Sequence, residues 1–438
     1  MCSLNIDADL RIFSGPYTGY GVHQEYCIRN IGELVSFQST AGKMQVLRDV
    51  DIHIAGGKIR AIGKNLSVDN GKVYDAKGAL VTPGFVDPHT HPVFNDTREI
   101  EHEMRVMGKG YMEIAKAGGG IRSSVRSLRS ADRESLKSKV RTRLDDFLRF
   151  GTTTIEAKSG YGLSAESELE SLRILRELDA EHPLDIRTTF LGAHEYPDEY
   201  RKDHEAYIDL LINEMLPRVV REGLADFCDI FCEEGVFSVS ESKRVLEAAK
   251  FLGLGIRLHA EEFKPIGGVQ LAARLGALSA DHLTAITEEG IQALKAGGVI
   301  PIVSPATTFF LGSQHYAPAR KMWDIGLPVA VSTDFNPGSS MTQSMAFVIS
   351  LACLQLQLSP LEALQAATFN AARSLQMEDR IGSLEPGKQA DLVIWELQHY
   401  QAIPYYLAYN RIREVWKKGA RVYSACASEI GAKSVLQS

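Results

Sequence analysis

The chain has 438 residues, of which 45% are hydrophobic and 24% are charged. These ordinary values exclude collagen-like, disordered and disulfide-scaffold classes of protein. The 48 Lys and Arg residues against 55 Asp and Glu residues give a net charge of −7, which argues against a nucleic-acid partner bound through a basic face.

The cysteines are few and widely spaced, which argues against a disulfide framework and for a reducing compartment. Two of them, four residues apart in a predicted strand, share one face and are expected to pack as small apolar groups. No apolar run approaches the roughly 20 residues of a membrane span, and the N-terminus lacks a signal-peptide core. We therefore expect a cytoplasmic protein with no membrane partner. The cysteines are Cys2, Cys27, Cys228, Cys232, Cys353 and Cys426, with the pair at 228 and 232.

The first 78 residues predict short strands and turns. Segment 44–63 alternates apolar and polar residues on both sides of Gly56 and Gly57, which is typical of a β-hairpin. Residues 376–438 again predict strands and turns, in segments 383–397 and 413–423. We expect the two terminal segments, 1–78 and 376–438, to pair into one small composite β-sandwich domain.

Between these segments, over residues 79–375, short β-branched runs alternate with longer helical patterns. Eight strands, each followed by a helix, predict a (β/α)8 TIM-like barrel, so the fold class is α/β. The predicted strands are 79–87, 151–159, 186–194, 226–233, 255–263, 278–283, 299–304 and 328–336.

Five of the 12 histidines and one aspartate stand at the ends of these predicted strands. The carboxyl ends of all strands of such a barrel converge on one mouth, where active sites are built. The residues are His89 and His91 on the first strand, His194 on the third, His259 on the fifth, His282 on the sixth and Asp334 on the eighth.

His89 and His91 are two residues apart on a strand, so both imidazoles point to the same side and can share one metal ion. His259 and Asp334 could complete a set of three nitrogens and one oxygen. Such ligands suit zinc, and iron is the alternative. The other histidines, which lack this placement, are expected to have structural or surface roles: His23, His53, His102, His182, His204, His315 and His399.

The predicted fourth strand ends in Glu233 and Glu234 and not in a lysine. Two-metal members of the superfamily named below often carry a carboxylated lysine at that point. Its absence favours one metal per chain, and Glu233 bridging a second ion is the alternative.

The motifs PGFVDPHTH (83–91), LHAEE (258–262), SADH (279–282), STDFNPG (332–338) and GSLEPGKQADLVI (382–394) resemble the amidohydrolase superfamily. More specific motifs, among them AGGGI (117–121), KSGYGL (158–163) and DFNPGSS (334–340), resemble the branch that opens the ring of 4-imidazolone-5-propanoate in histidine degradation. The resemblance runs from about residue 80 to 420. It implies hydrolysis of a cyclic amide to N-formimino-L-glutamate by a metal-activated water, in a homodimer.

The same resemblance implies roles for individual residues. It assigns His89, His91, His259 and Asp334 to the metal. It assigns Glu262, His282 and Asp334 to catalysis. It assigns substrate binding to Arg98, Tyr111, Tyr161, His194, Glu262, Asn336, Gly338 and Ser339.

The residues themselves support part of this assignment. The substrate carries a propionate, and Arg98, seven residues past His91, offers a bidentate carboxylate site to which Tyr161 could add a hydroxyl. Tyr111 follows a helix-like pattern, so packing is an equal alternative for it. Glu262 and Asp334 are both placed to move a proton, and the sequence does not divide this work between them.

Two other functions fit parts of the pattern. A nucleobase deaminase of the same superfamily would also use His259 followed by Glu262, but it has less need of an anion site at Arg98 and Tyr161. A non-catalytic scaffold of the same fold would lack the metal ligands, and all four are present here. Gly118, Gly119 and Gly120 lack the spacing and the lysine of a phosphate-binding loop, so no nucleotide is expected.

Overall fold

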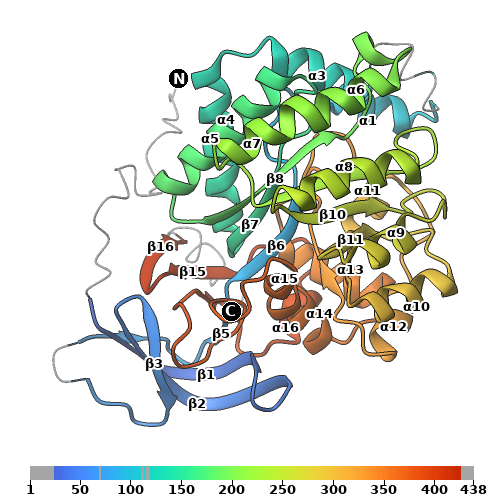
Figure 1. Ribbon diagram of the computed structural model, residues 1–438. Helices are drawn as coiled ribbons and strands as arrows, with labels where there is room; N and C mark the ends of the chain where they lie inside the picture. Colours follow the sequence, from blue (N-terminus) through green and yellow to red (C-terminus); the bar gives the residue numbers. More distant parts are fainter. Residues whose placement is uncertain (1–23, 69–70, 110–112, 114–118, 426–438) are drawn as a thin grey trace, which may run out of the picture.

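The computed structural model describes residues 24–68, 71–109, 113 and 119–425. Two sheets of eight strands each organise these residues (Figure 1). One sheet is the barrel that carries the site, and the other joins the two terminal segments of the chain. The predicted fold class is confirmed, whereas the exact domain boundaries at 78/79 and 375/376 stay a prediction.

The barrel consists of parallel strands in simple sequence order, from β6 to β13. The ring is closed between the first strand and the segment after the last one, where Thr90 pairs with Phe335 and the His91 amide donates to the Phe335 carbonyl (2.8 Å). The strands are β6 (Phe85–Thr90), β7 (Thr152–Lys158), β8 (Asp185–Ala193), β9 (Phe227–Cys232), β10 (Gly255–Ala260), β11 (Ser279–His282), β12 (Ile300–Val303) and β13 (Ala330–Val331).

Helices surround the barrel strands (Figure 1). Local sequence fixes where several of them begin: Ser164 caps α5, and Ser238 with Glu241 forms a capping box on α8. The helices are α1 (Glu99–Val106), α3 (Ile121–Arg129), α4 (Arg133–Arg149), α5 (Ala165–Glu181), α6 (His204–Leu210), α7 (Leu216–Arg221), α8 (Val239–Phe251), α9 (Gly268–Leu275), α10 (Glu288–Gly297), α11 (Pro305–Phe310), α12 (Ala319–Asp324), α13 (Met345–Gln355), α14 (Pro360–Ala366), α15 (Phe369–Ser374) and α16 (Ala402–Tyr405). Within the described residues no helix is long and apolar enough to cross a membrane.

The second sheet runs in the order β16, β15, β14, β5, β1, β2, β3, with β4 paired to β1. Its N-terminal strands (blue) and C-terminal strands (red) lie together beside the barrel in Figure 1. Gly56 and Gly57, both at positive φ, turn the predicted hairpin between β2 and β3. The strands are β1 (Tyr26–Gln38), β2 (Lys43–Ala55), β3 (Lys58–Gly63), β4 (Lys72–Asp75), β5 (Leu80–Pro83), β14 (Leu392–Trp395), β15 (Ile412–Lys417) and β16 (Ala420–Ser424).

One predicted strand is wrong in its extent. Segment 79–87 was expected to form the first barrel strand, but it is divided at Gly84 between two sheets. The first part, β5, pairs with β1 and β14 of the terminal sheet, and only the second part, β6, enters the barrel. A Cβ at Gly84 would lie 2.4 Å from the Thr153 side chain, so the chain crosses between the sheets at a residue without a side chain.

The cysteine prediction can be checked at four positions. Cys228 and Cys232 are fully buried on β9, and both are free, as are Cys27 and Cys353. Their packing in the core confirms the apolar role expected for the pair on β9. Cys2 and Cys426 lie outside the described residues.

Candidate active site at the barrel mouth

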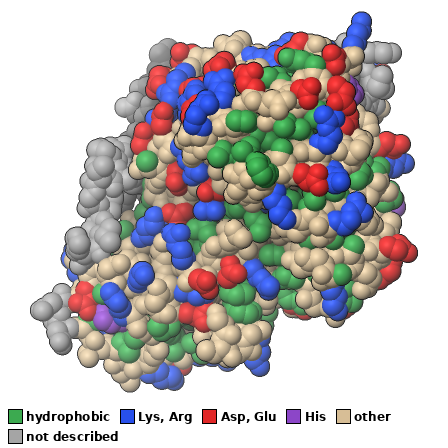
Figure 2. All heavy atoms as spheres, in the orientation of Figure 1, with side chains coloured by type: hydrophobic (Ala, Val, Ile, Leu, Met, Phe, Trp, Pro, Cys, Tyr) green, Lys and Arg blue, Asp and Glu red, His purple; other side chains and the backbone are tan. Residues whose placement is uncertain are grey.

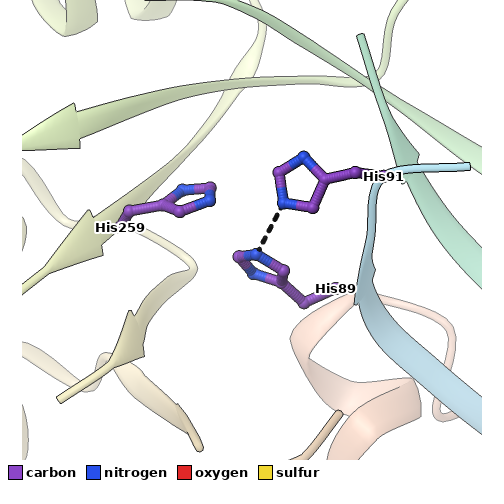
Figure 3. A group of neighbouring side chains, drawn as sticks. All are labelled: His89, His91 and His259. Carbon is purple, nitrogen blue, oxygen red and sulfur yellow. Dashed lines mark hydrogen bonds between the residues drawn. The ribbon is translucent and has the colours of Figure 1, made fainter. Parts of the chain in front are cut away.

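The four residues expected to hold a metal lie together at the carboxyl end of the barrel. His89 is on β6 and His91 directly follows it, His259 is on β10 and Asp334 follows β13. All four side chains are buried. Figure 3 shows the rings of His89, His91 and His259 around one point, with the first two joined by a dashed line. The barrel topology thus assembles residues that are up to 245 positions apart (334 − 89).

The spacing of these atoms fits a single metal ion. His89 Nε2 lies 3.2 Å from His91 Nε2, and Asp334 Oδ1 lies 3.5 Å from both nitrogens. A tetrahedral zinc with bonds of about 2.0–2.1 Å would separate its ligand atoms by about 3.3–3.4 Å. One ligand atom each of His89, His91 and His259 also lies within 4.8 Å of the other two. The donor set and its distances therefore fit zinc-type coordination.

A buried carboxylate is hydrogen-bonded to one of these imidazoles, His89, and a second carboxylate lies beside His259 without a hydrogen bond to its Nδ1. His89 Nδ1 lies 2.6 Å from Asp281 Oδ2, and His259 Nδ1 lies 3.0 Å from Asp229 Oδ2. When Nδ1 donates its proton to a carboxylate, Nε2 keeps its lone pair for a metal. Burial, together with nearby positive charges, lowers the pKa of His89 and His91 well below the usual range, so both rings are neutral, as metal ligands must be.

A buried lysine lies beneath this arrangement. Lys158, the last residue of β7, contacts Asp229 Oδ2 at 2.8 Å and Glu156 Oε1 at 2.7 Å, and all three side chains are fully buried. Arg257 lies 3.6 Å from Asp281 in the same interior layer. The two cations balance the carboxylates beside the histidines.

The backbone is strained at two of the site residues. His282 has φ +76° and Asp334 has φ +49°, which is the left-handed region that side chains rarely adopt. Asp334 is held by Thr307, whose hydroxyl donates to Oδ2 at 2.6 Å and leaves Oδ1 facing the histidines. His282 Nε2 is buried and makes no hydrogen bond to the described residues.

A cavity of about 610 Å³ opens above the metal ligands. It brings together the described substrate-binding candidates: Arg98, Tyr161, His194, Glu262, Asn336, Gly338 and Ser339. The metal-ligand candidates His91, His259 and Asp334 and the proposed catalytic His282 also line it. Tyr111 lies outside the described residues, so its role stays a prediction.

Arg98 lies at one side of this cavity and is held in place on two sides. Its Nε and Nη2 donate to Glu101 Oε2 at 2.9 and 2.6 Å, while Nη1 lies against Gly338. A Cβ on Gly338 would come within 2.4 Å of Nη1, so a side chain at this position would displace the guanidinium of Arg98. Arg105 donates to the Gly338 carbonyl at 3.3 Å and places a second guanidinium in the cavity.

Tyr161 and His194 also line the cavity and lie side by side, with ring centroids 5.3 Å apart. His194 Nδ1 donates to the Gly160 carbonyl at 2.9 Å, so its Nε2 is available as an acceptor toward the cavity. Burial lowers the pKa of His194 well below the usual range, and it raises the pKa of Tyr161, so both groups are neutral.

Glu262 and His282 lie close together near Asp334. Glu262 Oε1 is 3.9 Å from His282 Nδ1. Burial raises the pKa of Glu262 well above the usual carboxyl range, and the charges of Asp334 and Glu233 raise it further. A carboxyl group of this kind exchanges protons nearer to neutral pH than an exposed one, which suits general acid–base catalysis.

Asn336 shapes the loop that carries Gly338 and Ser339. Its Oδ1 accepts from the backbone amides of both residues at 2.8 Å, and its Nδ2 donates to the Asp334 carbonyl at 2.7 Å. These bonds hold the loop against the cavity, so Asn336 contributes to the position of its neighbours as well as to the lining.

Glu233, the alternative bridging ligand, is hydrogen-bonded to backbone amides of two loops. Its carboxylate accepts from the backbone amides of Phe263 and Lys264 at 3.0 Å, and from that of Glu234. These bonds tie the loop after β10 to the end of β9.

Sequence reasoning did not identify Asp229, Asp281, Lys158, Arg257 and Arg105 as site residues. Glu156 and Lys158 are two residues apart on β7, so their side chains share one face of the strand, whereas Asp281 and its neighbour His282 point to opposite faces. Their contacts join different strands, which no local pattern reports. The described histidines outside the site make other contacts, for example His182 with Asp145 and His53 with Glu25.

The chain belongs to the amidohydrolase family, whose model matches residues 80–422. Its relatives include proteins named imidazolonepropionase. The one from Alkaliphilus metalliredigens (strain QYMF) is 43% identical over 409 residues, which cover 90% of this chain and 97% of the relative. The one from Geobacillus kaustophilus (strain HTA426) is 47% identical over 382 residues, which cover 85% of this chain and 90% of the relative. The resemblance seen in the motifs is thereby confirmed.

Solved structures share the fold at much lower identity. E. coli guanine deaminase matches with a TM-score of 0.72 and 18% identity, over 92% of this chain and 100% of that chain. An adenosine deaminase from Xanthomonas campestris with bound zinc matches with a TM-score of 0.67 and 19% identity, over 93% of this chain and 96% of that chain. These likenesses show the fold, and the deaminase names do not carry over to this chain.

Proposed function

We propose that this chain is a metal-dependent hydrolase that opens the cyclic amide of 4-imidazolone-5-propanoate to give N-formimino-L-glutamate. The observation that carries the proposal is the joint lining of one cavity by His91, His259 and Asp334 of the proposed metal site and by Arg98. The substrate carries a ring carbonyl that would lie at the metal site and a carboxylate that would lie at Arg98, so its two ends match the two ends of the cavity. The imidazolonepropionase relatives support the same reaction.

His89, His91, His259 and Asp334 would hold the metal, which when bound lowers the pKa of a water from 15.7 to about 7. Zinc and iron both suit three imidazoles and a carboxylate, with one ion per chain. The spacing of 3.2 and 3.5 Å among the ligand atoms supports a single ion.

Arg98 binds the propionate of the substrate. Its Nη1 faces the Gly338 side of the cavity, while Glu101 fixes the other edge of the guanidinium. Arg105 adds a second positive charge to the same cavity, and Tyr161, which also lines it, supplies a hydroxyl. His194 accepts a hydrogen bond from a ring N–H through Nε2. A substrate fixed at both ends presents its carbonyl in one orientation.

Glu262 and Asp334 share the proton transfer. Glu262, close to His282, takes the proton of the attacking water and delivers it to the departing ring nitrogen, and Asp334 assists as a second acceptor of that proton. His282 stabilises negative charge on the carbonyl oxygen as the ring opens. The raised pKa of Glu262 supports its role as the group that alternates between base and acid.

The setting of the enzyme is part of the proposal. The four described cysteines are free, which is consistent with a cytoplasmic enzyme. A homodimer is supported by exposed apolar side chains on α13 and α16, which pack together: Leu354 is 66% exposed and Tyr405 is 81% exposed. Basic and acidic side chains are interspersed over the face drawn in Figure 2, which favours a small-molecule substrate over nucleic acid.

The experiment that tests this function compares the acid substrate with its uncharged methyl ester. A buried charge-assisted contact contributes about 1.5–3 kcal/mol, or about 10–150-fold in binding. Arg98→Ala should raise KM for the acid by that order with the metal retained, and the ester should be a poor substrate for the wild type. Equal kinetics for acid and ester in the wild type would refute the anion site and favour a deaminase.

A further inference from the structure

We propose that Glu168, which lies outside the cavity on α5, is a positioning residue for substrate recognition. Its carboxylate holds the loop 159–163 so that Tyr161 and His194 face the substrate. The inference rests on the proposed function, because it assigns Glu168 to the placement of two residues of that site.

The Glu168 carboxylate is fully buried and accepts its hydrogen bonds from one short loop. It lies 3.0 Å from the Gly160 amide, 2.7 Å from that of Gly162 and 2.8 Å from that of Leu163. Burial raises the pKa of Glu168, and the hydrogen bonds from this loop act in the opposite direction by stabilising the carboxylate. A buried carboxylate on three amides of a single loop fixes the path of that loop.

The same loop is held from its other side by Arg129 at the end of α3. Its Nε donates to the Gly162 carbonyl at 2.7 Å, and its Nη2 donates to the Leu163 carbonyl at 2.9 Å. The N–H groups of the loop therefore donate to the Glu168 carboxylate, and two of its carbonyls accept from the Arg129 guanidinium. Such a pairing of the backbone leaves little freedom to the residue between the two glycines, Tyr161.

The two glycines allow this close approach. Gly160 has φ +111°, and a Cβ there would lie 3.0 Å from His194 Nδ1. A Cβ on Gly162 would lie 2.7 Å from the Ser167 backbone. Side chains at either position would push the loop away from α5 and from His194, so the SGYGL motif is explained by contact with Glu168 as well as by Tyr161.

The hold on the loop extends to His194 through one carbonyl. Gly160 donates its amide to Glu168, and its carbonyl accepts from His194 Nδ1 at 2.9 Å. This bond sets which imidazole nitrogen carries the proton and directs Nε2 to the cavity. One buried carboxylate thus determines the position of both Tyr161 and His194.

A purely structural role is the alternative, since Glu168 lies in the first turn of α5, where a negative charge stabilises the helix. That role predicts a loss of thermal stability with no effect on KM. A positioning role predicts a change in KM and a dependence on Tyr161.

The test replaces Glu168 by glutamine, which keeps the size but sets an NH₂ group against the loop amides. Glu168→Gln should raise KM for 4-imidazolone-5-propanoate about tenfold or more, with metal content unchanged. Adding Tyr161→Phe should then cost much less than it does in the wild type, because the hydroxyl is already misplaced. Glu166→Gln is the matched control, since Glu166 is on the same turn, exposed, and paired with Arg218.

Hydrogen–deuterium exchange gives a readout that does not need turnover. Glu168→Gln should lose protection at the amides of Gly160, Gly162 and Leu163, and Arg129→Met should loosen the same loop if the first variant fails to fold. Wild-type KM and wild-type protection in a folded Glu168→Gln protein would overturn the inference, as would an undiminished effect of Tyr161→Phe. Absence of turnover by the wild type would instead overturn the proposed function, while the exchange data would still decide the role of Glu168.

Discussion

His89 Nδ1 lies 2.6 Å from Asp281 Oδ2, and both side chains are fully buried. This contact determines which nitrogen of His89 faces the proposed metal. A carboxylate behind a metal-binding imidazole fixes its tautomer and increases its basicity. Burial raises the pKa of Asp281 to about 6, with Arg257 and Lys158 acting in the opposite direction.

Asp281→Asn should weaken metal binding about 10–100-fold, because the amide is a poorer acceptor for the Nδ1 proton. The dissociation constant is measured by competition with a chelator on folded protein. Asp324→Asn, at a largely exposed carboxylate on α12, is the control and should bind metal like the wild type. Equal affinity in the Asp281 and Asp324 variants would show that Asp281 does not support the metal site.

Removal of a proposed ligand should remove the metal itself. His89→Ala and His259→Ala are each expected to lose most of the bound metal and nearly all activity, because three remaining ligands cannot replace the missing imidazole. Elemental analysis of purified protein measures this directly. His315→Ala changes an exposed histidine and should retain one metal per chain. Full metal content in both ligand variants would rule out the assignment.

Glu262→Gln should keep the metal and lose about 10²–10⁴-fold in turnover, the usual contribution of a general acid–base. Steady-state kinetics together with metal analysis separate this outcome from a structural defect. Turnover at the wild-type rate in the metal-loaded variant would show that Glu262 takes no part in proton transfer.

The pH profile provides a second check on Glu262. Its pKa is raised, chiefly by burial, so the carboxylate becomes protonated at a higher pH than an exposed one. Because the first proton acceptor must be ionised, kcat/KM should fall as the pH decreases through this raised pKa. The residual activity of Glu262→Gln should lack that acidic limb. An acidic limb at the ordinary carboxyl pKa in the wild type would contradict the role.

Lys417 of β15 joins the terminal sheet to the barrel. Its buried Nζ lies 2.8 Å from Asp185 Oδ2 at the start of β8 and 2.7 Å from Asp391 Oδ2. Lys417→Met leaves Asp391 without a cation and Asp185 with only the half-exposed Lys418, which should cost about 3–5 kcal/mol in unfolding free energy. Lys418→Met removes the half-exposed partner of Asp185 and should cost about 0–1 kcal/mol. Thermal unfolding of both variants measures the difference.

The ion pair of Lys417 with Asp185 also predicts that the unfolding free energy depends on pH. Burial raises the pKa of Asp185, but Lys417 and Lys418 outweigh this effect and the net shift is downward. A carboxyl with a lowered pKa in the folded state contributes stability above its unfolded pKa and loses it as the pH falls. The stability gap between wild type and Lys417→Met should therefore narrow in acid. A gap that widens as the pH falls would contradict this assignment.

Much of the site could be predicted because the carboxyl ends of all barrel strands meet at one mouth, so a residue at a strand end has a known place in the fold. Once His89, His91, His259 and Asp334 are placed at strand ends, the fold brings them together, and the structure does so. Division of segment 79–87 at Gly84 was not predicted, because both halves are apolar and suit either sheet. The absence of room for a Cβ at Gly84 comes from Thr153, 69 residues further along the chain (153 − 84), and no local pattern reports it.

The supporting residues were missed for the same reason. Lys158 on β7 and Asp229 on β9 form an ion pair with each other, so the role of each residue depends on a partner from a different strand. Glu168 looked like one of several acidic residues on an amphipathic helix, and only the path of the loop before it shows three amides on its carboxylate. Local patterns predict which side chains face the interior, while partners across the barrel need the fold.

The most direct test of the account is absorbance-monitored turnover of freshly prepared 4-imidazolone-5-propanoate by the metal-loaded protein, with the product identified. The account predicts disappearance of the imidazolone with stoichiometric N-formimino-L-glutamate, no ammonia release, and loss of the reaction when the metal is removed by a chelator. Absence of turnover with this substrate, together with ammonia release from guanine or cytosine, would contradict it.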